Sequence, residues 1–230
     1  MNNDEALQDT SRLLKSVSYF AALDASSLQL VARSATRRVF DAGQVIFLEG
    51  EPCAGLYVVE RGWLKVIKIG MDGREQVLQM LGPGDACNAI SVFTTAPNQA
   101  TVIALEASQV WLVRREPLLH MLDEHPALAR QVVKDLAGRV MHLVQMVEDL
   151  SLRSVEARLA RLLLELAEDE TIQRRRWATQ AEMAARLGTV PDVVNRALRK
   201  LAAAGLIFVE RQQIQILDRT RLRVIAQVDA

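Results

Sequence analysis

The stretch that decides the fold is HPALARQVVKDLAGRVMHLVQMVEDL, residues 125–150. Val133, Val140 and Val147 are spaced seven residues apart, and three leucines repeat this spacing three positions later. A heptad with valine at each a position and leucine at each d position favours a parallel two-stranded coiled coil. We therefore expect a dimerisation helix whose interface is formed by Val133, Leu136, Val140, Leu143, Val147 and Leu150. One amphipathic helix packed within a single chain is the alternative, because the repeat is short.

The composition narrows the class of protein. The 230 residues suffice for two modest domains, and the 50% hydrophobic content supplies a core for each. No apolar run reaches the roughly 18 residues of a membrane span, and the polar N-terminus is not a secretory signal. Two cysteines, Cys53 and Cys87, fit neither a disulfide framework nor a CxxC metal site. Because no nucleophile–base pair or metal cluster is readable either, we expect a cytoplasmic, non-enzymatic protein without a metal.

The charges are unevenly distributed along the chain. Residues 1–150 contain 14 Lys and Arg against 18 Asp and Glu, a net charge of −4. Residues 151–230 contain 14 against 10, a net charge of +4. A basic C-terminal third indicates a polyanionic partner for that part of the chain.

The part before the dimerisation helix changes from helical to strand patterns. Residues 11–36 have helical spacing, whereas from Arg38 onward short apolar runs are separated by glycines. Residues 55–60 and 63–69 are typical of strands, Met71-Asp72-Gly73 indicates a hairpin, and residues 102–113 add further strand. Regular short strands with turn glycines predict a small β-barrel or jelly roll.

An ordered set of motifs in this region resembles the cyclic-nucleotide-binding fold of the Crp/Fnr bacterial regulators. The motifs are Phe40, Gly43, Ile46, Glu49-Gly50-Glu51, residues 56–59, Gly62, residues 72–75 and Pro83-Gly84-Asp85. The resemblance extends from about Tyr19 to Gln227. It implies an α+β protein with an effector-sensing β-roll at residues 1–124, the dimerisation helix at 125–150, and a winged helix-turn-helix at 151–230.

The expected effector pocket departs from the family pattern. In its cyclic-nucleotide sensors, a Gly-Glu pair and a later Arg-Ser pair follow Pro-Gly-Asp, and they hold the ribose and the phosphate. Alignment at Gly84-Asp85 places Asn88-Ala89 and Gln99-Ala100 at these pairs, so both charged groups are missing. A buried phosphate without a cation is costly, which argues against cyclic AMP. The resemblance assigns to the pocket Asn88, Ala89, Gln99, Ala100, Arg139, Leu143 and Val144.

Three alternatives remain open for this pocket. The first is an apolar or weakly polar effector, which Ala89, Ala100, Leu143 and Val144 favour. The second is haem with a diatomic gas, since Ala96-Pro97-Asn98 is similar to the nitric-oxide-responsive branch. The third is a roll without a ligand. An iron–sulfur cluster is excluded because it needs about four cysteines. For haem, the imidazoles of the chain are His120, His125 and His142.

The C-terminal third contains the spacing of a helix-turn-helix. Thr179-Gln180-Ala181-Glu182 is a capping box that opens a short helix, which Gly188 ends. Pro191 suits the first turn of a second helix, and Gly205 its end. If Gln180 is counted as the first residue, the fifth is small, the ninth is a glycine and the fifteenth is apolar. A helix-turn-helix needs a small residue where its helices cross, a glycine in the turn and an apolar anchor on the second helix. These three residues are Ala184, Gly188 and Val194.

The second of these helices is expected to contact DNA. In the family, a Glu and an Arg four residues apart read base edges, and here the pair is Asp192 and Arg196. Arginine can bind guanine O6 and N7. Aspartate is shorter than the family's glutamate, and it either accepts a hydrogen bond from cytosine or orients Arg196. Residues 207–209 and 214–216 predict a β-hairpin wing with Arg211 at its tip. The DNA-contacting candidates are Thr179, Pro191, Asp192, Asn195, Arg196, Arg199, Lys200 and Arg211.

Together these patterns predict a homodimeric transcription regulator that binds a palindromic operator under the control of an unidentified effector. The expected partners are double-stranded DNA, a second copy of the chain and, for an activator, RNA polymerase. The alternative is a small-molecule or haem and gas-sensing module without DNA-binding activity.

Overall fold

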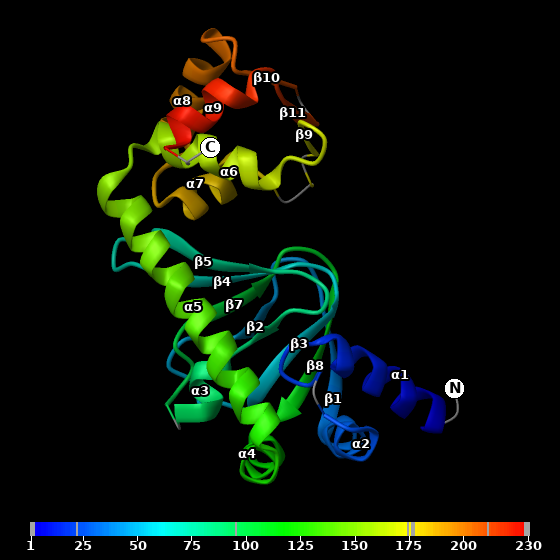
Figure 1. Cartoon of the computed structure of the whole chain (residues 1–230). Helices are drawn as coiled ribbons and strands as arrows, with labels where there is room; N and C mark the ends of the chain where they lie inside the picture. Colours follow the sequence, from blue (N-terminus) through cyan, green and yellow to red (C-terminus); the bar gives the residue numbers. More distant parts are fainter. Residues whose placement is uncertain are drawn as a thin grey trace. The chain divides into compact units, whose positions relative to one another are not determined.

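Two compact units make up the chain in the computed structural model (Figure 1). One contains residues 1–68 and 78–142, and the other contains residues 69–77 and 143–230. The structure describes residues 3–21, 23–94, 96–173, 175, 178–210 and 212–227.

The first unit contains a β-roll of two four-stranded sheets. Their strand orders are β1-β8-β3-β6 and β2-β7-β4-β5. A hydrophobic core that includes Phe47, Tyr57, Leu64 and Val110 draws on strands of both sheets, which confirms the predicted jelly-roll architecture. The strands are β1 (Ala35–Phe40), β2 (Val45–Phe47), β3 (Gly55–Arg61), β4 (Leu64–Ile69), β5 (Glu75–Leu81), β6 (Ala86–Cys87), β7 (Thr101–Ala104) and β8 (Ser108–Arg114).

Strand β3 separates two cores. Its side chains alternate in direction, so that Tyr57 and Val59 belong to the core shared by the two sheets, whereas Leu56 and Val58 pack against helices. The further strand structure predicted at residues 102–113 is confirmed, but it consists of two separate strands. The structure has β7 and β8 there, in different sheets, because residues 105–107 form a turn that the apolar content of the run conceals.

Helices cover the outer side of the β3 sheet. Leu14, Phe20, Leu28, Leu118 and Leu128 are fully or almost fully buried in one cluster with Leu56 and Val58 of β3. Asp24 caps α2, because its carboxylate accepts from the Ser27 amide at 2.8 Å. The helices of this unit are α1 (Asn3–Ser16), α2 (Ala25–Ser34), α3 (Ala89–Thr94), α4 (Arg115–Glu124) and the first part of α5 (Pro126–Leu152).

The predicted long helix is confirmed. Helix α5 covers the predicted residues apart from His125 and ends two positions later, at Leu152. Pro126 is its first residue, where a missing amide hydrogen costs no internal bond. Among the described helices, none combines the length and the hydrophobicity needed to cross a membrane.

The second unit contains a winged helix-turn-helix. Its core includes Leu159, Leu163, Val194, Leu201 and Ile214. Residues 171–173 form strand β9, which pairs with β11. Three residues are too few to show a period, so the sequence conceals this strand. The elements are α6 (Val155–Leu166), β9 (Thr171–Gln173), α7 (Gln180–Leu187), α8 (Pro191–Ala203), β10 (Ile207–Val209), β11 (Gln213–Ile216) and α9 (Arg219–Ala226).

Candidate functional site

The turn between α7 and α8 has the geometry that the sequence spacing predicts. Thr179 Oγ1 accepts from the Glu182 amide at 3.2 Å and so caps α7. Gly188 has a φ of +60°, a left-handed conformation that glycine adopts readily. The amides of Gly188 and Thr189 both donate to the carbonyl of Ala184, which is buried. This turn leads from α7 into α8, which begins at Pro191.

Helix α8 has one buried and one exposed face. Val194, Leu198 and Leu201 pack into the core, and Val194 is the apolar anchor that the spacing predicts. The side chains of Pro191, Asp192, Arg196 and Arg199 are exposed. Among the described residues, no ion pair joins Asp192 to Arg196, so the i,i+4 pair considered for them is not formed in the free chain.

Two other DNA-contacting candidates have partners within the chain. Asn195 Nδ2 donates to Gln180 Oε1 at 2.9 Å and thereby joins α8 to the start of α7. Lys200 forms an ion pair with Glu156 of α6. Arg211 lies outside the described residues.

Asn88, which is aligned with the first nucleotide-binding pair, forms an amide cluster with Asn98 in the β-roll. Asn88, at a φ of +73°, donates from Nδ2 to Asn98 Oδ1 at 2.9 Å and to the Gly55 carbonyl at 3.2 Å. Asn98 is only 3% exposed and donates to the Leu48 carbonyl at 3.2 Å. Sequence reasoning noted Asn98 only within a weak haem motif and missed this structural role.

The other aligned positions supply no charge. Ala89 and Ala100 are buried, and exposed Gln99 donates to the Pro97 carbonyl at 2.8 Å. Leu143 and Val144 belong to the second unit, where both are exposed. The segment from Asn88 to Ala100 is therefore held by amide hydrogen bonds without a cation of its own.

Arg139 is a partly buried member of an ionic network. Its Nε donates to Asp135 Oδ2 at 2.7 Å, and its Nη2 donates to the carbonyl of Ala86 at 2.7 Å. Asp135 also accepts from the hydroxyl of Tyr19, whose pKa is raised chiefly by burial. Arg139 thus joins α5 to β6, and the Asp135 carboxylate balances its charge. Tyr19 and Asp135 are site residues that sequence reasoning missed.

The cysteines are free thiols, and each histidine lies close to a polar group of the same chain. Cys87 is buried, and burial raises the pKa of its thiol to about 12. His125 Nε2 lies 3.1 Å from Ser27 Oγ, and His142 Nε2 lies 3.2 Å from the Leu78 carbonyl. His120 lies beside Glu124 on α4 at 3.3 Å. Among the described residues, no three His, Cys, Asp or Glu side chains form a group suited to a metal.

An exposed apolar row runs along α5. Val133 is 67% exposed, Val140 58%, Val144 55% and Val147 63%. Leu136, at the first d position, is instead partly buried against the core of its own chain. The later d positions, Leu143 at 41% and Leu150 at 39%, are exposed beside the a-position valines. Val144, which the family resemblance assigned to the effector pocket, lies at an e position of the same exposed surface.

An ionic cluster spans the join between α5 and α6. Helix α5 ends at Leu152, and Ser154 caps α6 by accepting from the Ala157 amide at 3.2 Å. Asp149 of α5 pairs with Arg153 and, at 3.4 Å, with Arg161 of α6. These carboxylate contacts link the two helices across two intervening residues. Sequence reasoning did not identify this cluster.

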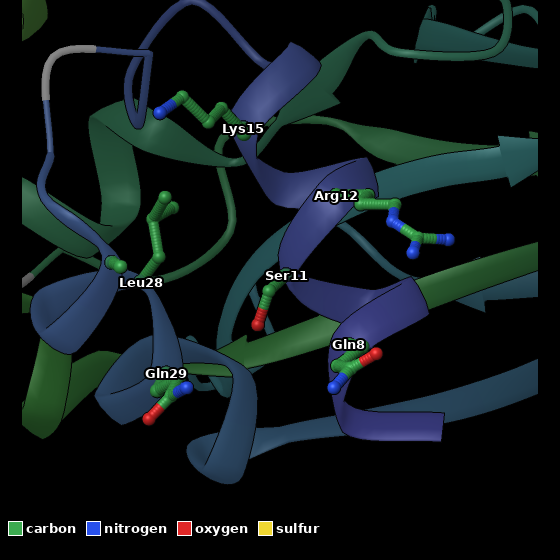
Figure 2. A pocket seen from close by; sticks show the side chains of 7 residues that line it. Gln8, Ser11, Arg12, Lys15, Leu28 and Gln29 are labelled. Carbon is green, nitrogen blue, oxygen red and sulfur yellow. The ribbon is translucent and has the colours of Figure 1, made fainter. Parts of the chain in front are cut away.

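A hollow of about 280 Å³ lies between α1 and α2 (Figure 2). Its cations are Arg12 and Lys15 of α1, and its other side is formed by Ala25, Leu28 and Gln29 of α2. Figure 2 shows the Arg12 and Lys15 side chains extending in opposite directions, so they do not converge on one ligand.

Comparisons with known proteins match both halves of the chain. The family described as the cyclic nucleotide-binding domain matches residues 37–125, and the Crp-like helix-turn-helix domain matches residues 157–225. The chain is 27% identical to a CRP-like cAMP-activated global transcriptional regulator of Mycobacterium tuberculosis, over 91% of this chain and 96% of that protein. It is 25% identical to the cyclic AMP receptor protein of Thermus thermophilus, over 93% and 98%.

Solved structures have the same architecture. FixK2 of Bradyrhizobium japonicum superposes with a TM-score of 0.75 at 25% identity, covering 85% of this chain and 99% of that one. The catabolite activator protein of Thermus thermophilus is 26% identical, with a TM-score of 0.53 over 91% and 98% of the two chains. With both domains matched in the same order, the chain belongs to the Crp/Fnr family of DNA-binding transcription regulators.

Proposed function

We propose that the protein is a homodimer that binds a palindromic operator through α8, and that its effector is not cyclic AMP. The observation that carries the proposal is the exposed face of α8. There Asp192, Arg196 and Arg199 point away from the core, while Val194 and Leu198 anchor the opposite face. An exposed arginine on a recognition helix can reach guanine O6 and N7 in the major groove.

The exposed row on α5 supports the dimer. A row of valines at 55–67% exposure costs free energy in water, and a second copy of the same helix would cover it. Two α8 helices would then enter successive major grooves about 34 Å apart. Such an arrangement recognises an inverted repeat.

The amide cluster supports an effector other than cyclic AMP. Two of the relatives above are cyclic-AMP regulators by name. In this chain, Asn88 and Asn98 hydrogen-bond each other, and Arg139 is paired with Asp135. A cyclic phosphate placed here would be desolvated without a free cation. We therefore expect that cyclic AMP does not raise the melting temperature of the protein. The absorption spectrum tests for haem, and a spectrum without a Soret band directs ligand screening toward apolar or weakly polar compounds.

The test is selection of bound DNA from a random pool, with wild type, Arg196→Ala and Arg199→Ala compared. We expect the wild type to enrich an inverted repeat. Arg196→Ala should cost about 1–3 kcal/mol and lose preference at one G·C pair per half-site. Arg199 is expected to contact the DNA phosphate backbone, so Arg199→Ala should weaken binding to all DNA sequences alike and reduce the salt dependence of binding. An unchanged base preference in Arg196→Ala contradicts the assignment of that residue.

A further inference from the structure

A second hollow, of about 520 Å³, lies in the second unit where the end of α5 meets α6 and α9. Its volume is within the range of small-molecule sites. Four of the described residues that line it are arginines from three segments, and Glu165 is the one acid among them. The arginines are Arg153, Arg161, Arg219 and Arg223.

Two of these arginines are fixed before any ligand arrives. The side chain of Arg153 is 12% exposed and pairs with Glu148 at 3.0 Å and with Asp149. Arg161 is 23% exposed and pairs with Asp149 and Glu165. Glu148 and Asp149 do not line the hollow, so they hold the guanidinium groups from outside it. A guanidinium has five N–H donors, of which these bonds use two in each residue.

The other two arginines come from α9. Arg219 pairs with Glu170 at 3.2 Å and remains 43% exposed. Arg223 lies one helical turn further along, with Gln227 beyond it. Arginines that meet from several directions suit a ligand with several anionic oxygens, and arginine binds phosphate oxygens in pairs. A single carboxylate would leave most of these donors unused.

We infer that this hollow is a binding site for a small, multiply charged phosphate compound, separate from the pocket of the β-roll. The ligand would take the place of the Glu165 carboxylate beside Arg161 and span to Arg219 and Arg223. Because Arg153 and Arg161 also hold the join between α5 and α6 through Asp149, a ligand that recruits them alters that join. This consequence for operator affinity rests on the proposed function, whereas binding itself does not.

The test is titration of the full-length protein with inorganic pyrophosphate by calorimetry at constant ionic strength. We expect saturable binding of one pyrophosphate per chain. Arg219→Gln and Arg223→Gln should each weaken it about tenfold, the loss expected for one charge-assisted hydrogen bond. Arg221→Gln is the matched control, because Arg221 is exposed on the same helix and does not line the hollow. Circular dichroism verifies that each variant is folded.

Two results would overturn the site. One is the absence of saturable heat. The other is equal weakening by Arg221→Gln, which would mean general attraction to a basic helix. If pyrophosphate does not bind but Arg219→Gln lowers the salt dependence of operator binding, the hollow contacts the DNA backbone instead, and the small-ligand site is wrong.

A second readout separates this inference from the proposed function. Arg196→Ala should retain full pyrophosphate binding even though it loses base preference. The calorimetric result therefore does not depend on whether the operator assignment is correct. With wild type, saturating pyrophosphate should change operator affinity, and with Arg223→Gln the same concentration should not. Unchanged affinity in wild type would show that the ligand does not recruit Arg153 and Arg161, contrary to the inference.

Discussion

Amide groups replace charges in the segment that follows β6. Asn88 and Asn98 bond each other and two backbone carbonyls, so both Nδ2 groups and Asn98 Oδ1 have partners without a ligand. A buried amide that is hydrogen-bonded costs little, whereas an unpaired buried charge costs several kcal/mol, on the order of 3–5. These residues therefore stabilise the segment between β6 and β7 rather than leave it open for an anion.

Cys87 should resist thiol reagents in the folded protein. Its pKa of about 12 keeps the thiol protonated over the working range of pH, and the thiolate is the reactive form. In a Cys53→Ser variant we expect negligible labelling by iodoacetamide at pH 8 and full labelling in denaturant. In a Cys87→Ser variant, half-buried Cys53 should react in the folded state. Rapid labelling of folded Cys53→Ser would contradict the buried position of Cys87.

Single residues differ in how far the sequence predicts their roles. Ala184, Gly188 and Val194 could be predicted, because a helix-turn-helix fixes their local spacing. Tyr19 and Asp135 could not, since 116 positions separate them and neither belongs to a local motif. Their contact arises only when α5 packs against the segment after α1.

Among the elements, the β-roll depends on glycines for two different reasons. Gly84 has a φ of +89° and open space where a Cβ would lie. Gly62 has a φ of +91°, and a Cβ there would lie 2.8 Å from Cα of Ser108 on β8. The first position needs only backbone freedom, whereas the second also needs the absence of a side chain.

The two glycines should therefore respond differently to alanine. Gly84→Ala should lower the free energy of unfolding by about 1–2 kcal/mol, the cost of a left-handed L-residue. Gly62→Ala should lower the free energy of unfolding by the same amount and by a further contribution of about 1–3 kcal/mol from overpacking. The β8 backbone cannot move away from the new side chain without breaking its pairing with β3. Urea denaturation measures both. Equal losses would mean that Ser108 moves away freely.

The apolar row on α5 shows what a heptad leaves undetermined. The repeat predicts a helix and its length, and both agree with the structure apart from terminal residues. It does not tell which apolar positions the same chain covers. Leu136 is covered by the core of the first unit, whereas Leu143, Val144 and Leu150 remain exposed beside the valines.

Val140→Asp should convert the dimer into a monomer. A carboxylate at this position would be desolvated within the apolar interface. Gln145→Asp is the matched control, since Gln145 is exposed and lies about 140° around the helix from Val140. Sedimentation velocity at micromolar concentration should show monomer for the first variant and dimer for the second and for wild type. Dimers of Val140→Asp would place the interface elsewhere.

At the scale of the whole molecule, the order of domains could be predicted from sequence because each has its own periodicity: glycine-separated strands, heptads, then capped short helices. The ionic cluster at the join of α5 and α6 could not, because Asp149 and Arg161 are ordinary charged residues of two amphipathic helices. Only the turn at Arg153 and Ser154 brings them together. In a dimer, this join would set the distance between the two copies of α8.

Asp149→Asn should therefore relax the spacing that the protein requires between half-sites without changing the bases it prefers within each. The neutral amide cannot balance Arg153 and Arg161 together, so the α5–α6 angle is held less firmly. Against operators lengthened or shortened by one base pair, discrimination should fall about fivefold, the equivalent of a partly exposed ion pair at ~1 kcal/mol. Glu165→Gln is the control, because Glu165 pairs with Arg161 within α6 and does not cross the join. Fluorescence anisotropy with the operator series measures both variants. If Asp149→Asn and Glu165→Gln discriminate equally well, Asp149 does not hold the join, and the turn at Ser154 alone fixes the angle.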